Sequence, residues 1–277
     1  MTVRETIQTI ERALQPLYDS REATAIAREV VSRRCGYTFS ELVVNYDSEC
    51  SIDNLQSIVE QLAAARPVQY VTGVAEFCDL QLKVAEGVLI PRPETAELVA
   101  QVIEESNRGV AILDVGTGSG AIAIALAKGI EGAVVTAVDI SERALEIAAE
   151  NCASNGVEIS LIKADALADM THLGKFDIIV SNPPYIPQSD MASMQRNVTD
   201  YEPHTALFVA DSDPLCFYRS IAQNALSMLK AGGRLYFEIC ERFGAEMVEM
   251  LDGMGYTDVV VSKDIFGKDR MVWCRKR

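Results

Sequence analysis

The run Ile112-Leu113-Asp114-Val115-Gly116-Thr117-Gly118-Ser119-Gly120 joins an apolar segment to three closely spaced glycines. A short run of branched apolar residues predicts a buried strand, and glycine lets the backbone turn sharply and approach a ligand closely. A helix is expected near residues 119–128, with its N-terminal N–H groups and positive dipole end directed at the loop. The run therefore predicts one strand-loop-helix unit of an α/β fold.

Strands and helices alternate from residue 110 onward. We predict strands near residues 110–115, 133–138, 158–162, 176–181 and 234–239, with helices near 119–128, 141–153, 214–229 and 242–254. Such alternation indicates a mostly parallel sheet covered by helices on both faces. Two final extended runs, 257–261 and 271–274, are expected to form an antiparallel hairpin at the edge of this sheet.

Leucine and isoleucine recur at helical spacing in residues 1–65, which predicts a small helical region at the N-terminus. A second helix is expected after Asp19 and Glu22, which are three residues apart as in a capping box, and a further helix from about Ser51. We interpret the apolar stripes as the core of this region. The sequence leaves open whether the region covers a substrate or holds a partner.

Extended sequence follows the helical region. Arg66-Pro67 ends the helices, Val68–Val71 is expected to be extended, and Leu80, Leu82 and Val84 alternate with polar residues. We therefore predict a small β-hairpin near residues 68–90. In the rigid loop that comes next, Arg92 is equally compatible with a solvated position and with a contact to a substrate or cofactor.

The composition argues against several classes of protein. The chain has 277 residues, 49% of them hydrophobic, and a net charge of −15, so it lacks the basic surface expected of a nucleic-acid-binding protein. Seven scattered cysteines without a C-x-x-C pair indicate reduced thiols in a cytoplasmic protein. With only two histidines no metal site is expected, and we find neither a membrane-spanning run nor the apolar core of a signal peptide.

Acidic residues at the strand ends indicate a nucleoside ligand. Asp139, 23 residues after Gly116, can bind both hydroxyls of a ribose, and Asp165 can accept from an adenine amine. Gly116-x-Gly118-x-x-Ala121 together with Asp139 also fits a dinucleotide fingerprint. Asp114, two positions before the first glycine, is more typical of S-adenosylmethionine enzymes, where it can serve the methionine amino group directly or through the loop.

The strand near 176–181 ends in Ser181-Asn182-Pro183-Pro184-Tyr185. Prolines cannot donate to a sheet, so the strand stops here and presents an amide, free carbonyls and an aromatic ring. The Asn182 oxygen and the Pro183 carbonyl can both accept from one NH2 group, and the Tyr185 ring can stack on a flat group. The alternative is a proline turn with Tyr185 in the core, but the upstream glycine loop favours a receptor for a planar amide or an exocyclic amine.

These motifs favour methyl transfer to nitrogen over hydride transfer. An amide nitrogen is a poor nucleophile because its lone pair is delocalised, and hydrogen bonds from its NH2 group would localise and direct that pair. Positioning and electrostatic preorganisation should supply most of the acceleration. A strong general base is not required, because the nitrogen becomes acidic only as the methyl group arrives.

Several segments together make the sequence resemble the release factor glutamine methyltransferases over most of the chain. They are Arg66–Gly73, Glu76-Phe77, Leu89–Thr95, Leu113–Gly120, Asn182–Tyr185, Tyr201–Leu207 and Gly267–Arg270. The resemblance implies a Rossmann-like, class I S-adenosylmethionine-dependent methyltransferase with a seven-stranded, mostly parallel sheet and an antiparallel edge hairpin. It also implies a helical substrate-binding domain at residues 1–66, a β-hairpin linker at 67–92 and a methyltransferase domain at 93–277.

The resemblance further implies transfer of a methyl group from S-adenosylmethionine to the glutamine of the Gly-Gly-Gln motif in class 1 peptide chain release factors. S-adenosylhomocysteine would be the product, and the enzyme would be a cytoplasmic monomer with the release factor as its partner. The residues expected to act on the acceptor glutamine are Asn182, Pro183, Pro184 and Tyr185, with Asn182, Pro183 and Tyr185 as the catalytic set. Those expected to bind the cofactor are Asp114, Gly116, Thr117, Gly118, Ser119, Gly120, Asp139, Asp165, Ala166 and Asn182.

Three other functions are compatible with parts of the sequence. The first is methylation of a glutamine in a ribosomal protein, against which the segments around Tyr70–Gly73 and Pro91–Glu94 favour a release factor. The second is adenine N6-methylation of nucleic acid, which the acidic charge opposes. The third is a non-catalytic adaptor that binds the cofactor, which the intact Asn-Pro-Pro-Tyr run opposes. Ala166 departs from the family, whose members often have an aromatic residue at this position.

Overall fold

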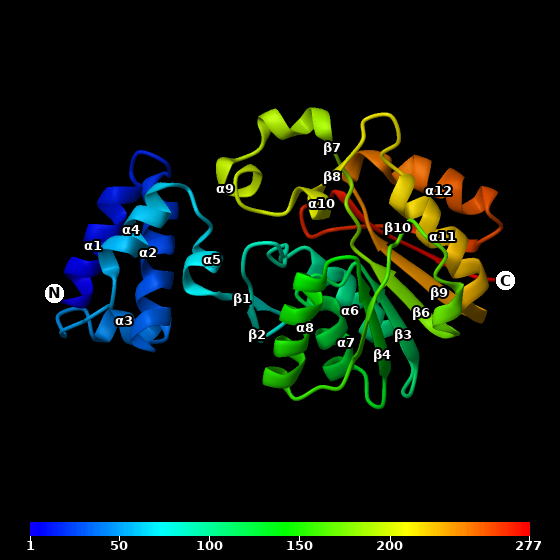
Figure 1. Cartoon of the computed structure of the whole chain (residues 1–277), viewed down its shortest axis with the longest axis horizontal. Coiled ribbons are helices and arrows are strands. Elements are labelled where there is room, and N and C mark those ends of the chain that lie inside the picture. The colour runs from blue at the N-terminus through cyan, green and yellow to red at the C-terminus, as the bar shows by residue number, and fades with distance from the viewer. The chain divides into compact units, whose positions relative to one another are not determined.

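The computed structural model describes all 277 residues, and they divide into two compact units (Figure 1). The helical unit comprises Met1–Val74 together with Gln195–Tyr201. The sheet unit comprises Ala75–Met194 and Glu202–Arg277. No helix is both long and apolar enough to cross a bilayer.

The helical unit is built from α1 (Val3–Leu14), α2 (Ser20–Cys35), α3 (Phe39–Val44), α4 (Leu55–Ala63), α5 (Val68–Thr72) and α9 (Arg196–Thr199). Its first helix begins with a capping box, in which Thr2 and Glu5 satisfy each other's backbone N–H groups. At the start of α2, Asp19 accepts from the backbone N–H groups of Arg21 and Glu22, which is the Asp19 half of the capping box expected there. The predicted apolar stripes pack into one core that includes Ile7, Ile10 and Leu14.

The helices of this part of the chain differ from the sequence expectations in three details, of which only the extended Val68–Val71 is contradicted outright. The structure has an additional helix, α3, whose start is marked by a capping box between Thr38 and Glu41. The helix expected from about Ser51 begins only at Leu55. Val68–Val71 is helical, not extended, because Pro67 precedes a single turn that Gly73 ends with φ of 81°.

A seven-stranded sheet forms the sheet unit. In spatial order its strands are β10 (Thr257–Lys263), β11 (Asp269–Arg275), β9 (Leu229–Glu238), β6 (Phe176–Ser181), β3 (Ala111–Val115), β4 (Val134–Asp139) and β5 (Ser160–Lys163). The five strands from β9 to β5 are parallel, whereas β11 is antiparallel to both β9 and β10. The predicted parallel sheet and its antiparallel edge hairpin are therefore confirmed.

Helices cover both faces of this sheet (Figure 1). One face packs against α6 (Thr95–Glu105), α7 (Ala121–Gly129) and α8 (Glu142–Asn155), and the other against α11 (Cys216–Met228) and α12 (Gly244–Gly253). Neighbouring strand residues alternate between the two cores, as Ile112 and Leu113 do. Burial on both sides explains why the central strand β3 is apolar along most of its length.

Shorter elements complete the fold. They are the hairpin of β1 (Val74–Phe77) and β2 (Leu80–Lys83), the pair β7 (Ile186–Pro187) and β8 (Phe208–Val209), α10 (His204–Leu207), and the 3-10 turns Thr171–Leu173, Gln188–Ser193 and Glu241–Phe243. All seven cysteines are free. After β3 the chain proceeds outward through β4 and β5, then returns to add β6 on the other side of β3. This reversal creates a switch point at the carboxyl ends of β3 and β6, where open α/β sheets bind ligands.

Candidate active site

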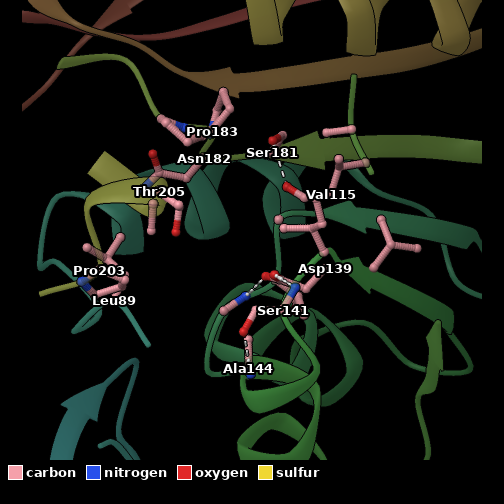
Figure 2. A pocket seen from close by; sticks show the side chains of 18 of the residues that line it. Leu89, Val115, Asp139, Ser141, Ala144, Ser181, Asn182, Pro183, Pro203 and Thr205 are labelled. Carbon is pink, nitrogen blue, oxygen red and sulfur yellow. Dashed lines mark hydrogen bonds between the residues drawn. The ribbon is translucent and has the colours of Figure 1, made fainter. Parts of the chain in front are cut away.

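A cavity of about 400 Å³ lies at the carboxyl ends of β3, β4, β5 and β6. Its size is that of a small-molecule site. In Figure 2, Asn182, Pro183 and Thr205 gather in one part of the cavity, and Asp139 and Ser141 line another. The structure thus brings most of the sequence-predicted residues to one place: Gly116, Thr117, Gly118, Ser119, Asp139, Asp165, Ala166, Asn182, Pro183 and Pro184 all line it.

The glycine loop between β3 and α7 is fixed to the end of β4. The N–H groups of Gly116 and Thr117 both donate to the carbonyl of Val138, at 2.9 and 3.0 Å. Gly116 has φ of 77°, and a Cβ built on it would meet nothing within 4 Å, so the space before it is open to a ligand. Gly120 lies outside the cavity lining, and a Cβ there would come within 3.3 Å of the Ala148 Cβ. Its role is close packing of α7 on α8.

Asp139 ends β4 with its carboxylate at the cavity. Its Oδ2 accepts from the Gly118 N–H and its Oδ1 from the Ser141 N–H, both at 2.9 Å (Figure 2). Burial raises the pKa of Asp139, although these backbone donors act in the opposite direction. The carboxylate therefore orders the glycine loop and the start of α8 while it faces the space in front of them.

The structure differs from the sequence expectation for Asp114. This residue is fully buried within β3 and does not line the cavity. Its Oδ2 accepts from the Thr117 hydroxyl at 2.7 Å, while Oδ1 has no hydrogen-bond partner. Of the two roles considered for Asp114, the geometry supports action through the loop. Desolvation raises the pKa of Asp114 to about 7.

We predict that Asp114 makes stability depend on pH. Its pKa is 3.8 in a model peptide and about 7 in the folded chain, so between these values the folded state binds more protons than the unfolded state. The free energy of unfolding contributed by Asp114 is therefore greatest below pH 3.8 and is lost as the pH rises through 7. Asp114→Asn keeps an acceptor for Thr117 and cannot ionise.

The measurement is the melting temperature of both proteins across pH. The difference, Asp114→Asn minus the unmodified protein, should become more positive by about 3 °C or more between pH 5 and pH 8.5. Taking the difference cancels the carboxylates that the two proteins share. A difference that stays constant over this range would contradict the assignment.

The part of the cavity near β5 is formed by Ala164–Leu167 together with Phe217 and Ile221 from α11. Asp165 accepts the Leu167 N–H at 2.8 Å, and the Ala166 carbonyl accepts from the Ser220 hydroxyl at 2.7 Å. Phe217 carries no sequence signal of this role, because only the packing of α11 against this loop brings its ring to the cavity. Phe217 thus provides an aromatic surface in the cavity that Ala166 lacks.

The opposite part of the cavity contains Asn182, Pro183 and Pro184. Directly before them, the buried Ser181 hydroxyl donates to the Val115 carbonyl at 2.7 Å and joins the ends of β6 and β3 (Figure 2). The Asn182 amide Nδ2 donates to the Thr95 hydroxyl at 3.2 Å. The strand end is therefore held from both sides, with the Asn182 side chain in a defined position.

Tyr185 does not line the cavity, contrary to the expectation that its ring stacks on a ligand. The ring packs against the core beneath α11 and α12, and its hydroxyl donates to Oε1 of the buried Glu238 at 3.1 Å. Burial, together with the nearby Glu238 charge, raises the pKa of Tyr185. The chain turns after Pro184, so the ring faces the carboxylate at the end of β9. Tyr185 therefore takes the alternative position, in which its ring is part of the core behind a proline turn.

Arg92 lines the cavity and is also paired. Its Nη2 donates to Oε1 of Glu202 at 2.6 Å, and the Ile90 N–H donates to Oε2 of the same carboxylate at 3.1 Å. The Glu202 side chain is 1% exposed, so its charge is balanced by these donors. Glu202 therefore fixes the loop that carries Arg92, whose side chain lies at the cavity and remains 33% exposed.

Asn151 in α8 is a further supporting residue, one that no sequence pattern marks. Its buried amide donates to the carbonyls of Lys83 and Ser119, each at 2.9 Å, and accepts from the Lys83 N–H at 2.6 Å. One side chain thus joins β2 to the glycine loop. A single asparagine in a helix carries no pattern that reveals such a contact, because both partners are distant in sequence.

Comparisons with known proteins agree with this geometry. Residues 94–200 match the family model described as the methyltransferase small domain. The chain is 43% identical over 267 residues to the release factor glutamine methyltransferase of Bacteroides thetaiotaomicron. The aligned region covers 95% of this chain and 96% of that protein. It is 46% identical over 220 residues to the protein of the same name from Streptococcus pneumoniae, covering 79% and 78% of the two chains.

A solved structure shows the likeness of fold. The 16S rRNA N2 G1207 methyltransferase of T. thermophilus, in complex with AdoMet and guanosine, superposes with a TM-score of 0.52 at 18% identity. The match covers 74% of this chain and 50% of that one. At this identity the likeness concerns the fold of the sheet and its helices and carries no information about the substrate.

Proposed function

The chain belongs to the family of release factor glutamine methyltransferases, and we propose on this basis that it methylates the side-chain amide nitrogen of a glutamine in a peptide chain release factor. One observation supports the reaction most directly: the Asn182–Pro184 strand end and the glycine loop line the same cavity. A methyl donor on the loop and an acceptor amide on the strand end would therefore meet within one site.

The residues that line the cavity suit S-adenosylmethionine as the cofactor. The open space before Gly116 admits a ligand close to the backbone, and the carboxylate of Asp139 offers acceptors for ribose hydroxyls. Asp165 and Phe217 supply an acceptor and an aromatic surface for an adenine ring. When bound, S-adenosylmethionine supplies an electrophilic methyl group on a sulfonium. Asp114 supports this site from beneath by holding Thr117.

The acceptor amide would be held by Asn182 and Pro183. Two acceptor oxygens, one on the Asn182 side chain and one on the Pro183 backbone, can receive both hydrogens of the glutamine NH2 group. These hydrogen bonds raise the electron density on the nitrogen and orient it toward the methyl donor. The acceleration of methyl transfer would then come from positioning and a fixed polar environment, without a strong base. Pro184 stiffens the strand end that carries both acceptors.

The substrate is the glutamine of the Gly-Gly-Gln motif in class 1 release factors, and the enzyme acts in the cytoplasm. We assign residues 1–66 to a substrate-binding domain, 67–92 to a linker and 93–277 to the methyltransferase domain. A nucleic-acid substrate is disfavoured because the chain carries a net charge of −15. The neutral side chain of glutamine requires no such basic surface.

Methyl transfer from radiolabelled S-adenosylmethionine tests the proposal. The purified protein is incubated separately with a release factor, the same factor with its Gly-Gly-Gln glutamine replaced by alanine, a ribosomal-protein mixture and duplex DNA. We expect label in the first reaction alone. Label in the ribosomal proteins or in DNA, with none in the release factor, would favour one of the alternative substrates and overturn the proposal.

A further inference from the structure

A buried carboxylate lies behind the acceptor end of the cavity. Glu238 ends β9 next to β6 and is 1% exposed. Its Oε2 accepts from the Thr95 hydroxyl at 2.6 Å and its Oε1 from the Tyr185 hydroxyl at 3.1 Å. Thr95 is itself buried and in turn receives the hydrogen bond from Asn182 Nδ2. Glu238, Thr95 and Asn182 thus form one chain of hydrogen bonds, and Tyr185 binds the second oxygen of Glu238.

The direction of each hydrogen bond in this chain follows from the chemistry of its members. The Thr95 hydroxyl donates to Glu238 Oε2, since an ionised carboxylate can only accept, and this bond uses the single hydroxyl proton of Thr95. The Thr95 oxygen is then left with lone pairs and can only accept from Asn182. The Asn182 NH2 group must therefore face Thr95, and its amide oxygen Oδ1 must point the other way.

We propose that Thr95 and Glu238 are positioning residues, which fix the Asn182 amide so that Oδ1 and not the NH2 group is presented to the acceptor glutamine. This inference deepens the proposed function and rests on it. Neither residue is assigned a contact with the reacting nitrogen: Glu238 sets the direction of the Thr95 hydroxyl, and the hydroxyl sets the orientation of the amide.

The orientation matters because the two faces of an asparagine amide have opposite polarity. With Oδ1 toward the substrate, Asn182 accepts from the glutamine NH2 group. In the reversed orientation its NH2 group would meet the NH2 group of the glutamine, and two donors would oppose each other. The two orientations have nearly the same shape, so packing alone selects between them poorly. A hydrogen-bond partner of fixed polarity is needed to select one.

The charge of Glu238 is set by several neighbours. Burial raises its pKa, whereas the hydroxyls of Thr95 and Tyr185 and the positive charge of Arg270 lower it; the charge of Glu94 raises it. If Glu238 were neutral, it could donate to Thr95, whose proton could then turn toward Asn182 and reverse the amide. The ionised form of Glu238 is therefore the one that supports the presented orientation.

Two substitutions at Thr95 separate the hydroxyl from the shape of the side chain. Thr95→Val keeps the branched shape and removes the hydroxyl, and we expect kcat for methylation of a release factor to fall by about tenfold or more. Thr95→Ser keeps the hydroxyl and loses a methyl group, and it should retain kcat within about threefold. Melting temperatures establish that both variants fold. Equal losses in both variants would contradict a role for the hydroxyl.

A double-mutant cycle with Asn182 tests whether Thr95 acts through the amide. Thr95→Val is introduced into the unmodified protein and into Asn182→Ala, and single-turnover rates are measured in all four proteins. A residue that only orients Asn182 has nothing to orient after the alanine substitution, so the second loss should be less than about twofold. The same loss in both backgrounds would overturn the proposal, because Thr95 would then act independently.

A readout without turnover comes from the side-chain NH2 signals of Asn182 in protein labelled with 15N-asparagine. Thr95→Val should move or broaden these signals, and Thr95→Ser should leave them close to those of the unmodified protein. Unchanged signals in Thr95→Val would contradict the Asn182–Thr95 hydrogen bond. The proposed function fails in a distinguishable way, since the unmodified protein would then methylate no release factor at all.

Discussion

Asn182→Ala is expected to lower the rate of single-turnover methyl transfer to a release factor by about 10²–10³-fold, the loss typical of removing one preorganised hydrogen-bonding group from a reacting centre. The variant loses the side-chain acceptor for the glutamine NH2 group but keeps the Pro183 carbonyl and the glycine loop. The affinity for S-adenosylmethionine should therefore change by less than about threefold. Rapid-quench assays at saturating cofactor and calorimetry measure the two quantities.

Asn182→Asp is the matched control because it nearly preserves the shape. Aspartate keeps acceptor oxygens for the substrate but loses the Nδ2 donor to Thr95 and adds a charge near Glu238. We expect a rate between those of the unmodified protein and Asn182→Ala. If Asn182 instead donates to the substrate, the aspartate variant should be as slow as the alanine variant. A near-normal rate for Asn182→Ala would remove the strand end from the acceptor site.

The fold and the position of the site could be predicted because they depend on local and periodic signals. Branched apolar runs separated by helical segments predict a parallel sheet, and the carboxyl ends of parallel strands necessarily meet at one edge. Gly116, Asp139 and Asn182 each follow a predicted strand, and all three line one cavity. The predicted class I methyltransferase fold is confirmed by the strand order and by the solved structure of similar fold.

The direction of side chains at the strand ends could not be predicted in the same way. Asp114 lies two residues before the glycine loop and Tyr185 three residues after Asn182, yet both are directed into the protein. Their orientation depends on buried partners, Thr117 and Glu238, whose positions follow from the packed sheet. In a strand, successive side chains point to opposite faces of the sheet. Beyond a strand that ends in two prolines, this alternation no longer predicts which way a side chain points.

Long-range polar contacts are the other feature that the sequence conceals. Thr95 and Glu238 are 143 residues apart, and Lys83 and Asn151 are 68 apart, so no motif spacing connects them. The helical conformation of Val68–Val71 was mispredicted for a local reason. β-branched residues favour a strand, but here Pro67 and Gly73 enclose one helical turn. Propensity gave the wrong expectation there because the flanking residues and burial outweighed it.

Asp139→Ala is expected to weaken S-adenosylmethionine binding by about 10²-fold, since charged hydrogen bonds contribute roughly 1.5–3 kcal/mol each. The carboxylate would be lost as an acceptor for the ribose hydroxyls, and the N–H groups of Gly118 and Ser141 would lose their partner. Both effects act on cofactor binding, so the loss should appear in the dissociation constant measured by calorimetry more than in the rate at saturating cofactor.

Asp139→Asn separates the two effects. Asparagine can keep one backbone acceptor but has no charge, so an intermediate loss of about tenfold is expected. Because burial raises the pKa of Asp139, the affinity of the unmodified protein should also fall as the pH is lowered toward that raised value, and the asparagine variant should lack this part of the dependence. Unchanged affinity in a folded Asp139→Ala protein would remove Asp139 from the cofactor site. Binding of NAD as strong as that of S-adenosylmethionine would instead restore the dinucleotide interpretation of the glycine loop, since a ribose-binding carboxylate after the second strand serves either ligand equally well.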